Sequence, residues 1–179
     1  MKHILHKILN ERIPDSEIIQ NIKRKDSEYT YLLHAINKKR EKLIEYLLTD
    51  PDININRIYS DITPHASAFH WACMSNIRIL KLFLGRKELD MNTTSLESTG
   101  LHWACGANKI RIVKELLLDA RINISVRNIW EQTALDIAIR QEHHRIANML
   151  KKVQYTSLIR IKNNLLCHDI IRMIICEYM

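Results

Sequence analysis

The sequence predicts an all-α solenoid of stacked helix-turn-helix units, joined by short hairpin fingers. The first observation is a segment that recurs four times, in which small and apolar residues at helical spacing precede a second apolar helix. The alanines Ala35, Ala72, Ala104 and Ala138 mark its register, 37, 32 and 34 residues apart. The second observation is that the 179 residues include only three glycines and three prolines, which disfavours a turn-rich β-sandwich. One such unit cannot bury its own apolar face, so the stack supplies the core.

The N-terminal segment, residues 1–28, is expected to form a helical cap on the stack. Two apolar stripes at helical spacing run through it, at Ile4, Leu5, Ile8 and Leu9 and at Ile18, Ile19 and Ile22. Between them, Asp15 or Ser16 is available as the N-cap of the second helix. Because the first unit of a stack has one uncovered face, a capping segment is expected there.

The repeated units are predicted over residues 29–152, and each contains a first helix, a tight turn, a second helix and an extended finger. Their expected bounds are 29–61, 62–94, 95–127 and 128–152. The third unit shows the pattern most clearly. Its first helix begins at Thr99-Gly100-Leu101-His102-Trp103-Ala104-Cys105, and its second helix contains Ile112-Val113-Lys114-Glu115-Leu116-Leu117.

These residues resemble the ankyrin repeat, whose consensus Thr-Pro-Leu-His-x-Ala-Ala precedes a Val-Val-x-Leu-Leu-Leu helix. In that family, the threonine and histidine of the motif hydrogen-bond to each other and to the local backbone. The resemblance implies this role for Thr99 with His102 and for Ser67 with His70. In the fourth unit Thr133 is kept, but an aspartate, Asp136, replaces the histidine.

The units also depart from the ankyrin consensus in several places. The motif proline is replaced by Tyr31, Ala68, Gly100 and Ala134, and the usual glycines between and after the helices are missing. The excursion from Asn56 to Ser67 is about three residues longer than the consensus finger, and the one after Asn92 is about one shorter. These departures predict a modestly stable array with individually shaped fingers.

The segment after the units, residues 153–179, is expected to form a helical tail. It resembles the opening of an F-box, and more closely the truncated F-box, called PRANC, that closes many poxvirus ankyrin proteins. The matching residues are Leu166, Asp169, Ile170, Ile174 and Tyr178, with Cys167 where a proline is expected. The resemblance implies that these five residues dock the adaptor subunit of a cullin-type ubiquitin ligase. The other interpretation is a helix that caps the fourth unit.

The histidine and cysteine pairs of the motif do not predict a metal site or an active site. His70 and Cys73 lie one unit away from His102 and Cys105, roughly 10 Å in a stack, whereas zinc needs four converging ligands. We find no third group to orient a Cys/His nucleophile and no phosphate-binding glycine motif. The sequence therefore predicts no enzyme activity, metal or cofactor. The two cysteines are expected to be buried thiols rather than a disulfide, and His143-His144 an exposed pair at a turn.

The net charge of +7 comes from short basic clusters such as Lys38-Lys39-Arg40 and Lys151-Lys152, interleaved with glutamates. No aromatic platform accompanies them, so they indicate solvated faces rather than a nucleic-acid site. No run approaches the ~20 apolar residues of a membrane helix, and no secretory signal is visible. We therefore expect an intracellular monomer, in the cytoplasm or the nucleus.

What remains is a protein-binding surface on the concave face, made of finger tips and first helices. Counting outward from the motif gives the candidates Tyr59, Asp61, Met74, Glu97, Trp130, Glu131 and Arg140. Trp130 is the strongest, because a finger offers little core to bury an indole, although local packing across the finger base is the alternative. Trp71 and Trp103 share one register and are expected to pack between units.

The predicted function is a non-enzymatic protein–protein interaction module. If the tail is a truncated F-box, the resemblance implies a viral host-targeting substrate adaptor for a cullin-type ubiquitin ligase, acting in the host cell. The second hypothesis is a stand-alone inhibitor that masks a signalling protein, like the IκB class of ankyrin proteins, which needs the units but not the tail.

Overall fold

The computed structural model describes residues 28–50, 53–59, 65–95 and 98–163. The predicted N-terminal cap, except Glu28, and all five predicted docking residues of the tail lie outside these ranges.

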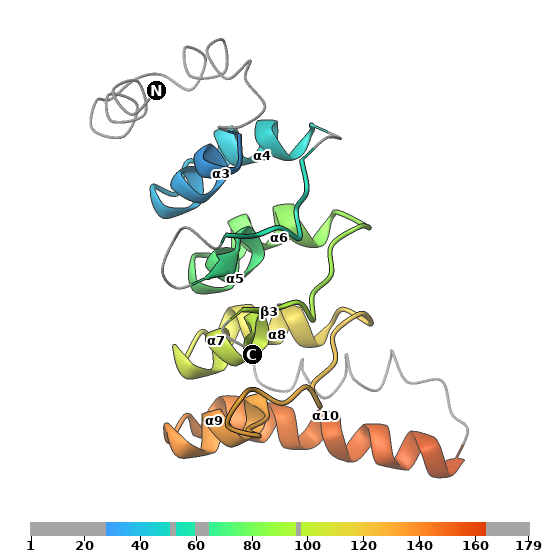
Figure 1. Ribbon diagram of the computed structural model, residues 1–179. Helices are drawn as coiled ribbons and strands as arrows, with labels where there is room; N and C mark the ends of the chain where they lie inside the picture. Colours follow the sequence, from blue (N-terminus) through green and yellow to red (C-terminus); the bar gives the residue numbers. More distant parts are fainter. Residues whose placement is uncertain (1–27, 51–52, 60–64, 96–97, 164–179) are drawn as a thin grey trace.

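Helix pairs stack one above another along the chain (Figure 1). The pairs are α3 (Glu28–Asn37) with α4 (Glu41–Leu48), α5 (Ala68–Met74) with α6 (Ile77–Leu84), α7 (Gly100–Gly106) with α8 (Ile110–Leu117), and α9 (Ala134–Arg140) with α10 (His144–Asn163). Two-residue antiparallel hairpins form the fingers before α5 and α7: β1 (Ile58–Tyr59) with β2 (Ala66–Ser67), and β3 (Thr94–Ser95) with β4 (Ser98–Thr99). The fold is the predicted all-α solenoid.

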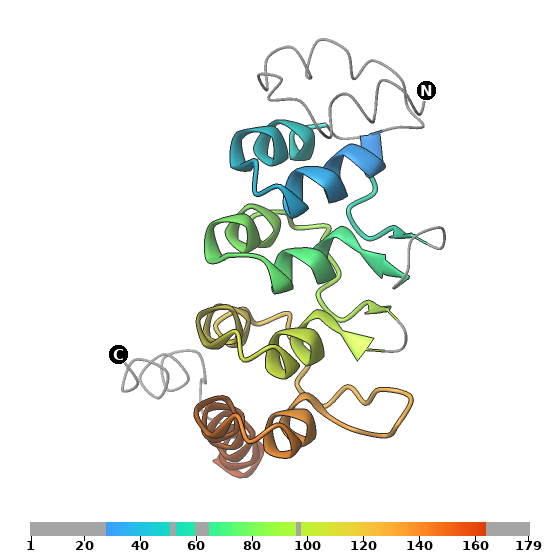
Figure 2. The same ribbon diagram turned by 90° about the vertical axis from the view of Figure 1, so that its left-hand side faces the viewer.

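The stack has three layers, which Figure 2 shows from the end of the helices. The second helices form one layer, the first helices the middle layer, and the fingers project beyond the first helices on the other side. The second helices carry apolar stripes at i, i+1 and i+4, such as Ile79, Leu80 and Phe83, all fully buried. The four register alanines are also fully buried, so successive units share one continuous core.

The buried motif histidines join each unit to the next finger. In the third unit, Nδ1 of His102 accepts from the Thr99 backbone N–H at 3.2 Å and lies 2.8 Å from the Thr99 hydroxyl. Its Nε2 lies 3.1 Å from the carbonyl oxygen of Gln132. Because a backbone N–H can only donate and a carbonyl only accept, the proton must be on Nε2. His70 makes the same contacts, with Ser67 and with the carbonyl of Ser98. The hydrogen bonds expected from the motif are thus confirmed.

The fourth unit replaces this histidine with a carboxylate. The backbone N–H and hydroxyl of Thr133 donate to Oδ2 of Asp136 at 2.8 and 2.7 Å, the contacts that an imidazole Nδ1 receives in the other units. The hydrogen bond from the Thr133 backbone lowers the pKa of Asp136 most, and the hydrogen bond from the Thr133 hydroxyl lowers it further. A carboxylate has no N–H donor comparable to the imidazole Nε2–H, so it needs no carbonyl from a following finger.

The inter-helix turns explain how the chain folds without the consensus glycines. Lys39, Asn108 and Glu142 take left-handed backbone angles, with φ of 56°, 54° and 57°. This region favours glycine, but it is accessible to other residues as single positions in tight turns. The turn of the second unit differs, because only Ser75 and Asn76 separate α5 from α6 and neither has a positive φ.

Asparagine side chains connect the bases of successive fingers. Asn92 donates through Nδ2 to the carbonyl of Arg121 at 2.9 Å and accepts from the backbone N–H of Asn123 at 2.8 Å. Asn56 makes the equivalent pair one unit earlier, with Glu88 and Asp90. These hydrogen bonds satisfy backbone groups of the next unit, so they fix the spacing between successive units.

One sequence expectation requires correction, that of an exposed His143-His144 pair. The expected boundary at residues 152 and 153 falls inside helix α10, which continues to Asn163 without a break. Its buried side chains, Met149, Leu150, Val153 and Thr156, keep helical spacing across that point. His143 is not an exposed partner of His144, because it is half-buried and its Nδ1 lies 2.8 Å from the carbonyl oxygen of Cys105.

Candidate protein-binding surface

The fourth finger differs from the two hairpins, because residues between α8 and α9 form an irregular turn held by one asparagine. Oδ1 of the buried Asn128 accepts from the backbone N–H groups of Trp130 and Gln132 at 3.0 and 2.9 Å. The Asn128 backbone N–H donates to the carbonyl of Gln132 at 2.9 Å, and Arg127 donates to the carbonyl of Glu131. The tip is therefore an ordered loop.

This loop turns its large side chains outward. Trp130 is 65% exposed and Ile129 is 47% exposed, and Glu131 beside them is exposed with a φ of 57°. We call Ile129, Trp130 and Glu131 the fourth-finger surface. Within it, the tip backbone is fixed by Asn128 while the indole packs on little of the finger. The alternative of local packing across the finger base does not describe Trp130.

A second apolar side chain, Ile139 on α9, is 49% exposed. The equivalent position in the third unit is Cys105, which is fully buried between α7 and α9. Ile139 is exposed because no further helix pair among the described residues packs over it. The candidate residues that the sequence predicted include neither Ile129 nor Ile139. Ile139 could have been found from its place in the last repeated unit.

The structure separates the other predicted residues rather than bringing them to one point. Met74 and Arg140 end α5 and α9, at the far end of the first helices from the fingers. Met74 is half-buried and Arg140 exposed. Tyr59 is described only as backbone in β1, and Asp61 and Glu97 lie outside the described residues. Trp130 and Glu131 are the predicted pair that the structure presents together.

The remaining tryptophans pack between units, as expected from their common register. The rings of Trp71 and Trp103 meet edge to face with centroids 6.2 Å apart, and Trp103 also contacts the ring of His70 at 5.3 Å. Both side chains are half-buried. They belong to the scaffold that supports the concave face.

Comparison with protein families gives a match to a model of ankyrin repeats in three copies, over residues 69–161. This range covers more than half of the chain and includes the second, third and fourth units. The chain belongs to the ankyrin-repeat family. Comparison with curated proteins finds no match. The α3–α4 pair precedes the matched range but stacks on α5 and α6 in the same way as the later ankyrin repeats (Figure 2).

Membership of this family identifies the chain as a protein–protein interaction module, and ankyrin repeats are typically non-enzymatic. The environment of the two motif cysteines disfavours thiolate chemistry. Cys73 and Cys105 are free and buried, and burial raises both pKa values, that of Cys105 to about 12. A neutral thiol is a poor nucleophile and a poor metal ligand.

Two further findings apply to the described part of this ankyrin protein. None of its helices is long and apolar enough to cross a membrane. No group of three or more His, Cys, Asp or Glu side chains within the same ranges is arranged to hold a metal ion.

Proposed function

We propose that this chain is a non-enzymatic binding protein that holds a protein partner on its concave face, with Trp130 as the central anchor. The observation that supports this proposal is the exposure of an indole, 65%, on a tip whose backbone is already fixed. Tryptophan is among the residues most enriched at interface hot spots. Because Asn128 orders the tip in the free protein, binding loses little conformational entropy there.

Ile129, Glu131 and the neighbouring α9 extend this anchor into a surface. Ile129 adds apolar area next to the indole, and Glu131 supplies a charge at its rim. An apolar centre with a polar rim is the usual arrangement of a protein interface. The other predicted contact residues are Tyr59, Asp61 and Glu97 on the fingers, and Met74 and Arg140, which only a partner that spans the whole length of the first helices would reach.

The test is affinity purification from cell lysate with the full chain, followed by quantitative mass spectrometry. The Trp130→Ala variant is expected to lose at least tenfold of the specific partner, since hot-spot truncation costs about 2 kcal/mol or more. Tyr155→Ala is the matched control, because Tyr155 is a comparably exposed aromatic residue, 67%, on α10. Equal recovery by the two variants would refute the role of Trp130.

For the finer role, we propose a substrate adaptor for a cullin-type ubiquitin ligase, with the partner on the ankyrin repeats and the ligase adaptor subunit on the tail. The resemblance of Leu166, Asp169, Ile170, Ile174 and Tyr178 to a truncated F-box supports it. The same resemblance implies a viral protein acting inside a host cell, in the cytoplasm or the nucleus.

The adaptor proposal is tested by purifying the full chain and a variant that lacks residues 164–179. Recovery of the ligase adaptor subunit by the full chain alone would support the proposal. Recovery by both would exclude the tail as the docking segment. Recovery by neither, with the partner still bound, would favour the second candidate, a stand-alone inhibitor of the IκB kind.

A further inference from the structure

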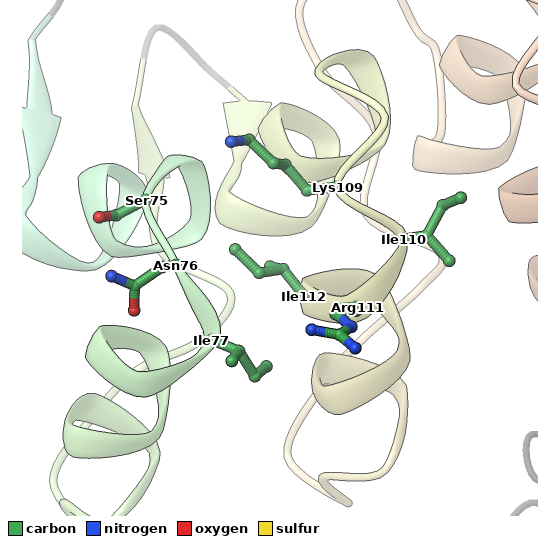
Figure 3. A pocket seen from close by; sticks show the side chains of 7 residues that line it. All are labelled: Ser75, Asn76, Ile77, Lys109, Ile110, Arg111 and Ile112. Atoms are coloured by element: carbon green, nitrogen blue, oxygen red, sulfur yellow. The ribbon is translucent and has the colours of Figure 1, made fainter. Parts of the chain in front are cut away.

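A pocket of about 340 Å³ opens between the inter-helix turns of the second and third units. Its walls are Ser75, Asn76 and Ile77 on one side and Lys109, Ile110, Arg111 and Ile112 on the other. Figure 3 shows Ile77 extending toward the third unit, and Lys109 and Ile112 extending back toward the second. We call this space the turn pocket. It lies at the opposite end of the first helices from the fingers.

The turn pocket lies beside the turn of the second unit, which is one residue shorter than the other three inter-helix turns. The second-helix residues Ile44, Val113 and Ala147 follow the register alanines by nine residues, but Leu80 follows Ala72 by eight. Between the third and fourth units, His143 bridges the two turns, since its Nδ1 lies 2.8 Å from the Cys105 carbonyl oxygen. Lys109 occupies the equivalent position in the third unit and makes no such bond.

The pocket has a positive rim and an apolar interior. Lys109 and Arg111 are its charged residues, and no carboxylate lines it. Neither cation makes an ion pair within the described ranges. The carboxylates of the adjacent helices already have partners, since Glu41 lies 3.6 Å from Arg78 and Glu115 lies 3.3 Å from Lys81.

The backbone adds to this positive charge. The N-cap residue of α8 is Lys109, and its side chain accepts no hydrogen bond from the first turn. The N–H groups at the start of α8 therefore have no acidic or hydroxyl cap, and the helix dipole places partial positive charge at the same edge. The turn edge to either side of the pocket carries further cations, Lys38, Lys39, Lys42, Arg140 and Arg145, interleaved with Glu41 and Glu142.

We propose that the turn pocket binds an acidic peptide segment of a partner protein, with one aliphatic side chain in the pocket and flanking carboxylates on Lys109 and Arg111. The volume is at the lower end of ordinary ligand sites, so it accommodates an aliphatic side chain with the peptide backbone next to it rather than a large ligand. Ile77 and Ile112 extend into the pocket and give that side chain an apolar lining (Figure 3), and the two cations favour a negative partner. The lining contains no aromatic ring on which a base could stack, which favours peptide over nucleic acid.

This surface is separate from the fourth-finger surface. The two lie at opposite ends of the first helices, so a partner on Trp130 leaves the turn pocket open. The inference therefore goes beyond the proposed concave-face function, and each can fail without the other.

The test is a titration of the full ¹⁵N-labelled chain with the blocked peptide acetyl-Glu-Asp-Leu-Asp-Glu-amide. The amide signals of residues 75–77 and 109–112 are expected to shift most. Two further peptides, one with serine in place of leucine and one with all acids replaced by their amides, are each expected to bind at least fivefold more weakly. These two peptides separate the apolar and the electrostatic parts of recognition.

The variants Arg111→Glu and Lys109→Glu/Arg111→Glu are expected to weaken binding of the acidic peptide at least tenfold. Arg145→Glu is the matched control, because Arg145 holds the same register in the fourth unit, outside the pocket, and its effect should stay below threefold. An unchanged amide spectrum outside the site verifies that each variant is folded, and the single variant serves if the double one is not.

Several outcomes would overturn the proposal. Shifts concentrated elsewhere, or equal weakening by Arg145→Glu, would reduce the effect to the net charge of the edge. If the full chain fails to bind the acidic peptide, the proposal is wrong. Concentration-dependent sedimentation would then show whether a second copy of the chain covers the pocket instead. Tighter binding of a 20-nucleotide oligothymidine at the same residues would assign the edge to nucleic acid.

Discussion

Two buried imidazoles, His70 and His102, carry polar contacts between successive units, and both depend on a neutral ring. Burial is the main cause that lowers the pKa of His70 to about 4, and burial lowers that of His102 as well. A protonated ring would lose the Nδ1 lone pair that accepts from Ser67 or Thr99. The stability of the scaffold is thus linked to pH through these two histidines.

The chain is therefore expected to lose stability as the pH falls from 6.5 toward 4. In this window the unfolded chain binds protons on these histidines that the folded chain does not, so the free energy of unfolding rises with pH. The loss is about 1.4 kcal/mol for each pH unit and each fully affected ring. Urea denaturation at pH 7 and pH 5 measures it.

The control for this prediction is the double variant His70→Leu/His102→Leu. Leu33 holds the equivalent position in the first unit, so leucine is compatible with the helix pair. The variant should be less stable at pH 7 but show a flatter dependence on pH. A wild-type stability that is the same at pH 7 and pH 5 would contradict the assigned role.

Gly100 is another residue whose identity the structure explains. It occupies the first position of α7, where the consensus has proline. A Cβ there would lie 2.7 Å from Sγ of Cys73 and 3.0 Å from the ring of Phe69. The absence of a side chain lets α7 approach the second unit closely.

Gly100→Ala is expected to destabilise the chain by about 1–3 kcal/mol through overpacking. Gly106→Ala at the other end of the same helix is the control, because its Cβ would lie 3.6 Å from Ile137, an ordinary contact. It should be neutral or stabilise by up to about 1 kcal/mol. Thermal or urea unfolding of both variants makes the comparison, and equal effects would contradict the close approach at Gly100.

At the scale of elements, the fourth finger depends on one side chain for its shape. Asn128→Ala removes the oxygen that accepts from the Trp130 and Gln132 N–H groups. We expect faster hydrogen exchange at these two amides and weaker partner binding, with the helix stack unchanged. Asn128→Asp keeps the acceptor oxygen and is expected to keep both amides protected. Equal exchange in the two variants would show that Asn128 does not order the tip.

The sequence predicted the repeating elements well, because their apolar spacing and motif residues are local signals. Thr99 and His102 lie three residues apart, so their hydrogen bond follows from one turn of helix. His143 was misjudged because its partner, the Cys105 carbonyl, belongs to another unit 38 residues away. The turn pocket was missed for a similar reason: the shorter second turn is visible in the sequence, but a cavity depends on how the neighbouring unit packs.

The site could be predicted only in part. The exposure of Trp130 follows from its position on a finger, but Asn128 as the support of the tip depends on a backbone conformation that residue types did not specify. Ile139 is exposed because of its place at the end of the described stack, a property of the assembly of units. The assignment of Met74 and Arg140 to the partner-binding surface stays a prediction. The structure places both at the ends of the first helices that lie far from the finger tips.

At the scale of the whole molecule, the ankyrin stack presents two candidate surfaces on opposite sides of one scaffold. The fingers carry the apolar anchor, Trp130, and the turn edge carries the basic pocket of Lys109 and Arg111. Asn56 ties the first unit to the second, His70 and Asn92 tie the second to the third, and His102 ties the third to the fourth. Because these hydrogen bonds fix the spacing of successive units, both surfaces keep a constant geometry, and a partner meets a preformed site.

The most direct test of the central claim is hydrogen–deuterium exchange of the full chain, alone and with its purified partner. Binding on the concave face predicts that the partner slows exchange in residues 126–135, which contain the fourth-finger surface and the start of α9. This protection should be lost in Trp130→Ala and retained in Tyr155→Ala. Protection confined to the turn edge or to α10, with the fourth finger unchanged, would contradict the claim.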